Sequence, residues 1–343
     1  MNRRDFLENG LKAGAALSLA GTPLFGRTQS APTISFVSWG GSWGDFVQKY
    51  WIAPFTKQTG IGVTLVSGPD LAKVKAQVAS NNILWDIVDG FTQVGAKENL
   101  WEPIDFKVID PARFIVKPPS SGIPTNGYFG GIAYDPNRSK PPARDFAQFW
   151  NVKNIPGRRG LSNRVSEMLE MALLADGVSA AKLYPLDVDR AFKVLDRIKP
   201  SVKVWFSETG QGVSLIQSKE VEYTYTYYNR VTVAKDSGVS IDFSLDQCIQ
   251  QLSYYSVVRG TPRKEAAMRF LEFITRPEQQ AAVVNVHRGS LFSPVRGLDK
   301  LIEPVVKRAM PDLSGPKQVI FDNQYWADHF TELDKRFKEW ALD

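Results

Sequence analysis

The sequence has very little cysteine and histidine. Cys248 is the only cysteine among 343 residues, so no disulfide can form within one chain and the core must hold the fold together. The two histidines, His287 and His329, leave few residues for a histidine-based metal site or a catalytic base. Beyond the N-terminus there is no apolar run of about 18 residues, so we expect no membrane span in the mature chain.

The chain also lacks a strong charge of one sign. Its net charge is +6, and the basic residues are spread along the sequence. The densest basic group, GRRG at 157–160, has no interleaved aromatic residues, so we expect a solvated loop there and no binding of nucleic acid. There is no internal repeat and no low-complexity segment. A composition that is 43% hydrophobic over this length predicts a globular protein of about two domains.

The N-terminus has the layout of an export signal. Arg3 and Arg4 precede Phe6 and Leu7, and an apolar stretch follows over residues 10–26. This pattern predicts a twin-arginine signal over residues 1–30, cleaved near Ser30, and therefore a periplasmic protein. An ordinary first helix with two arginines is the alternative. Removal of residues 1–30 takes away four basic and two acidic residues, which lowers the net charge from +6 to +4.

Strand and helix patterns alternate from Thr33 onward. The segment TISFVSW reads as a buried strand, and a helix with a kink at Pro54 is expected after it. A second strand, a helix and the short strand WDIVDG follow, which gives a βαβαβ order. This order predicts an α/β fold with a parallel sheet and helices on both faces. The amphipathic tail over residues 325–343 is expected to dock on a domain surface.

Several phrases in consistent order resemble the solute-binding proteins of ABC importers, in the spermidine/putrescine-like group of extracellular solute-binding family 1. The phrases are PFTKQTGIGVTL, WDIVDG, GYFGGIAYDPN, LLADGV, LYPLDVDRAF and SVVRGTPRKEAAMRFLEFITRPEQQA. They extend over roughly residues 33–300. The resemblance implies the type II periplasmic-binding-protein fold, with two lobes that each hold a mixed, mostly parallel sheet flanked by helices. Ligand is then held in the cleft between lobes joined by crossing strands.

This resemblance also implies a division of the chain and a set of partners. Residues 31–133 and 257–305 are expected to form lobe 1, and residues 134–256 and 306–343 lobe 2. The protein is expected to be a monomer that delivers a small molecule to a permease in the inner membrane. No cofactor, metal or enzymatic activity is expected.

The segment Gly40–Gly44 fits G-x-S-x-G, the nucleophile motif of serine hydrolases. A secreted hydrolase that uses Ser42 is therefore an alternative function. Neither histidine has an obvious catalytic setting in the sequence, and the motif follows the first mature strand rather than a later one. We expect instead that Ser42 caps the next helix and that Trp39 lines the cleft.

An organic cation such as putrescine or spermidine needs aromatic faces and carboxylates. Most candidates lie where strands end, and Glu167 matches a carboxylate that faces ligand amines in the related family. Glu170, one helical turn on, competes with it for that role. For each candidate the alternative is packing or an exposed surface. The predicted ligand-binding residues are Trp39, Trp43, Asp89, Phe91, Asn126, Tyr128, Glu167, Tyr227, Tyr228, Asp246 and Tyr255.

The stretch EYTYTYYNR is the most unusual segment. Alternation places Tyr223, Tyr225 and Tyr227 on one face of a strand, and Thr224, Thr226 and Tyr228 on the other. The pair Tyr227 and Tyr228 raises a second function, capture of ferric iron by phenolate oxygens. Two departures from the polyamine binders leave the ligand open: Ser253 stands where they carry an aspartate, and Arg230 offers a partner for a ligand carboxylate. A zwitterionic amine therefore remains an alternative to a polyamine.

Overall fold

The computed structural model describes residues 32–208 and 210–342. The predicted export signal over residues 1–30 lies outside the described residues. Among the helices that are described, none combines the length and the apolar character that crossing a bilayer requires.

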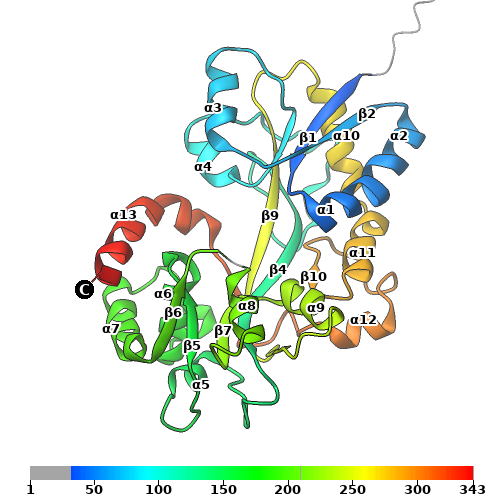
Figure 1. The fold of residues 1–343 in the computed structure, drawn as a ribbon. Helices are drawn as coiled ribbons and strands as arrows, with labels where there is room; N and C mark the ends of the chain where they lie inside the picture. Colours follow the sequence, from blue (N-terminus) through cyan, green and yellow to red (C-terminus); the bar gives the residue numbers. More distant parts are fainter. Residues whose placement is uncertain (1–31, 209, 343) are drawn as a thin grey trace, which may run out of the picture. The chain divides into compact units, whose positions relative to one another are not determined.

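One sheet runs through the described chain, in the strand order β2-β1-β3-β9-β4-β7-β5-β6 (Figure 1). Its two ends are parallel, and the strands in its middle, β9 and β4, pair antiparallel with each other and with their outer neighbours. Short strands β8 and β10 pair with β4, and β11 pairs with β9. The strands are β1 (Thr33–Ser38), β2 (Gly62–Ser67), β3 (Ile87–Asp89), β4 (Ile123–Tyr134), β5 (Arg159–Ser162), β6 (Val202–Phe206), β7 (Tyr223–Tyr227), β8 (Asp242–Phe243), β9 (Ile249–Val257), β10 (Leu291–Phe292) and β11 (Val319–Ile320).

Helices cover both ends of this sheet (Figure 1). They are α1 (Gly41–Phe46), α2 (Ala53–Thr59), α3 (Leu71–Ala79), α4 (Thr92–Lys97), α5 (Phe146–Trp150), α6 (Val165–Ala175), α7 (Val188–Ile198), α8 (Gln211–Gln217), α9 (Tyr228–Asp236), α10 (Lys264–Ile274), α11 (Pro277–Val286), α12 (Pro304–Ala309) and α13 (Asn323–Leu342). The predicted kink at Pro54 is wrong in its place, because the irregular turn precedes it as a π-helical segment over Val47–Ile52. Pro54 itself lies in the first turn of α2, where a missing N–H is tolerated.

The two largest clusters of buried hydrophobic side chains lie at opposite ends of the sheet, which we call the first and second lobes. In the first lobe, Phe36 and Phe270 belong to one cluster of buried side chains, and in the second lobe Leu169 and Phe337 belong to another. Strands β4 and β9, which cross between the lobes, contribute to both clusters. For example, the start of β4 packs in the first-lobe cluster and its end packs in the second-lobe cluster. This confirms the predicted two-lobe fold. The predicted boundaries at 133/134 and 256/257 stay a prediction.

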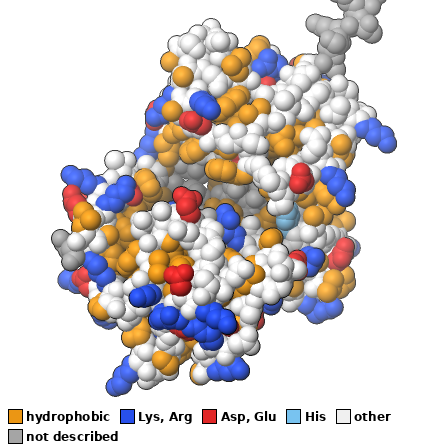
Figure 2. Space-filling view, viewed as in Figure 1, with side chains coloured by type: hydrophobic (Ala, Val, Ile, Leu, Met, Phe, Trp, Pro, Cys, Tyr) orange, Lys and Arg blue, Asp and Glu red, His pale blue; other side chains and the backbone are white. Residues whose placement is uncertain are grey.

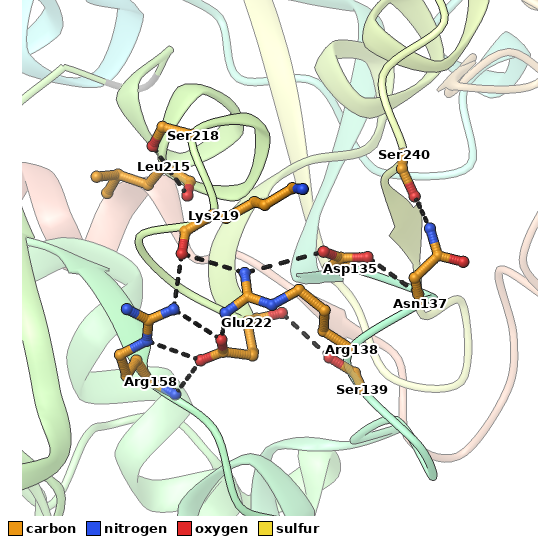
Figure 3. Close-up of polar contacts among 10 residues, drawn as sticks. All are labelled: Asp135, Asn137, Arg138, Ser139, Arg158, Leu215, Ser218, Lys219, Glu222 and Ser240. Carbon is orange, nitrogen blue, oxygen red and sulfur yellow. Dashed lines mark hydrogen bonds and ion pairs between the residues drawn. The ribbon is translucent and has the colours of Figure 1, made fainter.

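Buried arginine and glutamate stabilise the second lobe. Glu222, just before β7, accepts hydrogen bonds from the backbone and guanidinium of Arg158 and pairs with Arg138 (Figure 3). The neighbouring Arg159 is fully buried, and its guanidinium lies 4.8 Å from the centre of the Tyr223 ring and donates to three backbone carbonyls. The expectation of a solvated GRRG loop is therefore wrong for Arg159. The arginine tolerates burial because its fork of donors is satisfied by carbonyl oxygens.

The C-terminal helix α13 docks on the second lobe, as its amphipathic pattern predicts. Trp326, Leu333 and Phe337 are buried in the second-lobe cluster. The same helix contacts the first lobe, because Lys97 at the end of α4 donates to the carbonyl of Ala327 over 2.7 Å and pairs with Asp328 over 2.5 Å. Helix α13 therefore contacts both lobes.

Candidate ligand-binding site

Polar and aromatic side chains from both lobes lie close to the crossing strands β4 and β9. Figure 2 shows that this face of the molecule is hollowed between the first lobe, above, and the second lobe, below. One group of side chains surrounds Asp89 in the first lobe, and a second group surrounds Glu167 in the second lobe.

Asp89 owes its place to the parallel pairing of β1 with β3, which brings the carboxyl ends of the two strands together. Its side chain is 2% exposed and accepts a hydrogen bond of 2.8 Å from the Ser38 hydroxyl, which ends β1. Burial raises the pKa of Asp89 to about 7, although hydrogen bonding from Ser38, Trp39 and Tyr255 opposes the shift. Without a cation nearby, this carboxyl is therefore only partly ionised at neutral pH.

Tyr255 and Asn126 join this group to the crossing strands. Tyr255 in β9 stands opposite Asp89 in the sheet, and its hydroxyl donates to Asn126 Oδ1 over 3.4 Å. Burial, followed by the charge of Asp89, raises the pKa of Tyr255 well above its ordinary value. Tyr255 therefore stays a neutral hydrogen-bond donor beside the carboxyl group.

The aromatic residues that follow β1 and β3 have different surroundings. Trp39 is 52% exposed. Trp43 is half-buried, stacks on Phe46 at 5.2 Å and donates from Nε1 to Ser38 over 3.1 Å. Phe91 is half-buried against the first-lobe core. Trp39 therefore has the free ring face that a ligand needs, whereas Trp43 is mainly a packing residue with a polar link to the site.

The role expected for Ser42 as a helix cap is wrong. Helix α1 begins at Gly41, with Gly40 as its N-cap residue and without a side-chain capping hydrogen bond. Ser42 instead lies exposed in the first turn of the helix. Its hydroxyl forms no hydrogen bond within residues 32–208 and 210–342, whereas a catalytic serine needs a base within hydrogen-bond reach.

Glu167 forms the centre of the second group. It has a left-handed backbone conformation, with φ of +73°, and a side chain that is 2% exposed. The Tyr227 hydroxyl donates to it over 2.9 Å. Burial raises the pKa of Glu167 to about 7 against the opposing charge of Arg164 and the hydrogen bond from Tyr227. Glu170 is fully buried on the far side, where Tyr184 and Trp326 donate to it, so of the two carboxylates it is Glu167 that lines a small pocket.

Arg164 is a site residue that the sequence analysis missed. It is exposed and contributes to a small pocket with Glu167, and no carboxylate of the described residues is close enough to form an ion pair with it. Desolvation lowers the pKa of Arg164, but electrostatic interaction with Tyr227 and with the Glu167 carboxylate outweighs it, so the net pKa is raised. The pocket is lined by Ser162, Arg164, Glu167, Phe206, Tyr225, Thr226 and Tyr227. The position of Arg164 in the sequence could have identified it, because Arg164 lies just after the end of β5, as Trp39 lies just after the end of β1.

Tyr128 lies between the two groups. Its ring meets that of Tyr227 edge-on at 5.2 Å, and its hydroxyl donates to Gln251 over 2.9 Å. Burial raises its pKa, and the charges of Glu167 and Asp89 add to the shift while Arg164 opposes it. The Nε2 atom of Gln251 is buried without a partner among the described residues, which leaves a free donor next to Tyr128. The region around Tyr128 is therefore influenced by the carboxyl groups of both lobes.

The structure does not bring Tyr228, Asp246 or Arg230 to this region. The Tyr228 ring stacks on Phe243 at 5.1 Å, and its hydroxyl donates to the carbonyl of Ala309 over 3.5 Å. Tyr227 and Tyr228 therefore have different neighbours, and the described residues hold no group of three histidine, cysteine or carboxylate side chains suited to a metal ion. Asp246 is exposed beyond β8, which pairs with the far end of β4. Arg230 is exposed on α9.

A larger pocket of about 430 Å³ lies elsewhere in the second lobe. It is bounded by α6, α7 and the segment between them, and none of the predicted ligand-binding residues lines it. Two of its charged side chains are already engaged, because Asp187 caps α7 and Arg190 pairs with Asp176. The groups around Asp89 and Glu167 are therefore the candidate ligand-binding site.

Comparison with known proteins agrees with this architecture. A γ-aminobutyric acid-binding protein of Pseudomonas aeruginosa is 32% identical over 345 residues, which covers 95% of this chain and 96% of that protein. The solved structure of a GABA receptor is 32% identical, with a TM-score of 0.80 over 90% of this chain and 97% of that chain. The spermidine/putrescine-binding periplasmic protein of Escherichia coli K12 is 22% identical over 288 residues, which covers 77% of this chain and 82% of that protein. The profile of bacterial extracellular solute-binding proteins matches residues 50–296, and the chain belongs to this family of ABC substrate-binding proteins.

Proposed function

We propose that the protein captures a small zwitterion that carries an ammonium and a carboxylate at opposite ends, with γ-aminobutyric acid (GABA) as its simplest example. The observation that carries this proposal is Arg164, an exposed cation without an ion-pair partner, in the same pocket as the buried Glu167. An arginine fork matches a carboxylate in two-point contact.

The two buried carboxyl groups supply the other half of the recognition. Asp89 and Glu167 both have pKa values raised to about 7 by burial. A ligand ammonium nearby would stabilise their ionised forms and replace the hydration that burial has removed. The exposed ring of Trp39 adds a face for the ammonium or for the aliphatic part of the ligand, with a cation–π contribution of about 0.5–2 kcal/mol.

A polyamine remains the second candidate, because two separated carboxylates also suit a diamine. Against it stands Arg164, whose positive charge would repel the second ammonium of putrescine near Glu167. The known relatives support the same order of preference, since the GABA-binding protein is more similar to this chain than the spermidine/putrescine-binding protein. The sequence-based prediction of a polyamine thus gives way to a zwitterion.

The remaining parts of the function follow from membership of the family. We propose that the lobes close about the crossing strands when ligand binds and that the closed form delivers the ligand to the permease of an ABC importer. The protein would act as a periplasmic monomer and would release its ligand chemically unchanged. The predicted twin-arginine signal would supply the route of export.

Calorimetry with three small molecules tests the ligand class. GABA carries both charges, butylamine lacks the carboxylate, and butyrate lacks the ammonium. We expect GABA to bind at least about 100-fold more tightly than either analogue, because each analogue leaves one charged group of the site unpaired. Butylamine that bound as tightly as GABA would show that Arg164 does not recognise a carboxylate.

A further inference from the structure

Glu167 is held by a contact with Glu170, which does not line the pocket. Its backbone is non-helical, with φ of +73° and ψ of −36°, although it lies within the first turn of α6. A left-handed conformation is unfavourable for a residue with a side chain, so neighbouring groups must stabilise it. The strained residue is also the one whose carboxylate reaches the pocket.

The stabilising group is the carboxylate of Glu170. Its Oε2 accepts a hydrogen bond of 2.8 Å from the backbone N–H of Glu167. This bond corresponds to one half of a capping box, in which a glutamate in the first turn reaches back to a backbone N–H at the helix start. Because Glu167 and Glu170 are almost fully buried, water does not replace this bond.

Glu170 is in turn fixed by a helix from the far end of the chain. Its Oε1 accepts from the Tyr184 hydroxyl over 2.6 Å and from Trp326 Nε1 over 2.5 Å. Trp326 belongs to α13 and is buried in the second-lobe cluster with Leu333 and Phe337 of the same helix. The Glu170 carboxylate thus receives three donors on two oxygens, and an indole N–H can only donate.

We propose that Glu170 is a positioning residue, which holds the backbone of Glu167 in its left-handed conformation and so directs the Glu167 carboxylate toward the ligand ammonium, with Trp326 of α13 as its anchor. This inference rests on the proposed function for its ligand, but its structural part can be measured without ligand. The C-terminal helix α13 would thus support the binding site, although none of its side chains lines the pocket.

The test uses a substitution that keeps the shape and removes one acceptor. In Glu170→Gln the side chain cannot accept from both Glu167 and Trp326, because its amide nitrogen only donates. We expect GABA to bind at least about tenfold more weakly. We also expect the Glu167 amide proton to exchange with solvent at least about tenfold faster in the ligand-free protein, as hydrogen exchange read by NMR reports.

A second substitution makes the test specific. Trp326→Phe removes the indole N–H, so in the double variant the glutamine oxygen can accept from Glu167 while its amide nitrogen donates to the Tyr184 oxygen. We expect the double variant to recover most of the affinity and amide protection that Glu170→Gln loses. Trp326→Phe alone should raise neither above its wild-type value. A general loss of stability predicts no such recovery, and denaturant melts of all four proteins identify that case.

The outcomes separate the two proposals. Unchanged exchange at Glu167 in Glu170→Gln, or a double variant that is no better than the single one, would overturn the positioning role. Absence of GABA binding by the wild-type protein would overturn the proposed function instead. In that case the amide-exchange cycle, which needs no ligand, still decides the role of Glu170.

Discussion

Asp89 and Glu167 are both buried carboxyl groups whose pKa values rise to about 7, but the molecule holds them in different ways. Asp89 ends a regular strand and receives the Ser38 hydroxyl, so its position follows directly from the sheet. Glu167 has a strained backbone, a second buried carboxylate behind it and a cation beside it. The first lobe thus presents a simple acceptor, whereas the second lobe presents an acceptor and a cation together.

This difference indicates how a fold shared with polyamine binders can recognise a zwitterion. An acceptor such as Asp89 suits any amine. Under the proposed function, only the second lobe, through Arg164, would distinguish a ligand that carries a carboxylate. Ligand selectivity should therefore depend mainly on the second lobe, whereas both lobes should contribute to affinity.

Removal of the cation should have the largest effect. For Arg164→Gln we expect GABA binding to weaken by about 2–5 kcal/mol, because a ligand carboxylate loses its charged partner in a partly desolvated site. Arg230→Gln is the matched control, since Arg230 is an exposed arginine on α9. Calorimetry on both variants measures the effect, and a larger loss in Arg230→Gln than in Arg164→Gln would place the carboxylate elsewhere.

The two carboxyl groups should make binding depend on pH. Each must ionise to pair with an ammonium, so GABA affinity should rise with pH up to about 7, by as much as about tenfold per unit for each group. The stability of the ligand-free protein should change in the opposite sense. Between the ordinary carboxyl range near pH 4 and about pH 7, the unfolded state is ionised while the folded state keeps its protons, so unfolding becomes easier as pH rises.

Proton release on binding, measured by calorimetry in buffers of different ionisation enthalpy, separates the two groups. Glu167→Gln and Asp89→Asn should each remove part of the release near pH 7. A pH-independent affinity would mean that the carboxylates are not paired with the ligand. A loss of release in Asp89→Asn alone would confine the ammonium to the first lobe.

The smallest effect is expected for the aromatic residues of the first lobe. Trp39→Ala should weaken binding by about 1–2 kcal/mol and leave the melting temperature of the ligand-free protein nearly unchanged, because the ring is 52% exposed. Trp43→Ala should lower that melting temperature clearly, since the ring packs on Phe46 and Trp51. Thermal melts with and without GABA measure both, and the reverse pattern would exchange the two roles.

The comparison of the lobes also explains what could be predicted from the sequence. The alternating strand and helix patterns predicted the parallel end of the sheet in the first lobe, and the carboxyl end of a strand then located Asp89. Resemblance to a family located Glu167, but no local pattern predicts its left-handed backbone, which depends on Glu170 and Trp326 over 156 residues of sequence separation. The alternation of Tyr223, Tyr225 and Tyr227 did not reveal that Tyr228 begins α9 and packs away from Tyr227.

Arg164 and Asp246 show the limits of reading charge from sequence. Arg164 follows a strand of only four residues in which a buried arginine interrupts the apolar pattern, so the strand end was hard to see. Asp246 precedes the return strand, but an irregular segment carries it toward the far end of β4. Which charge faces the cleft is thus decided by tertiary packing rather than by distance from a strand in the sequence.

The most direct test of the account is the ratio of GABA to putrescine affinity, measured by calorimetry on the wild-type protein and on Arg164→Gln under identical conditions. The account predicts that the wild-type protein prefers GABA by at least about tenfold, and that the substitution lowers this preference by removing the carboxylate partner and the repulsion of a second ammonium together. A wild-type protein that binds putrescine more tightly than GABA, with a preference that Arg164→Gln does not change, would contradict it.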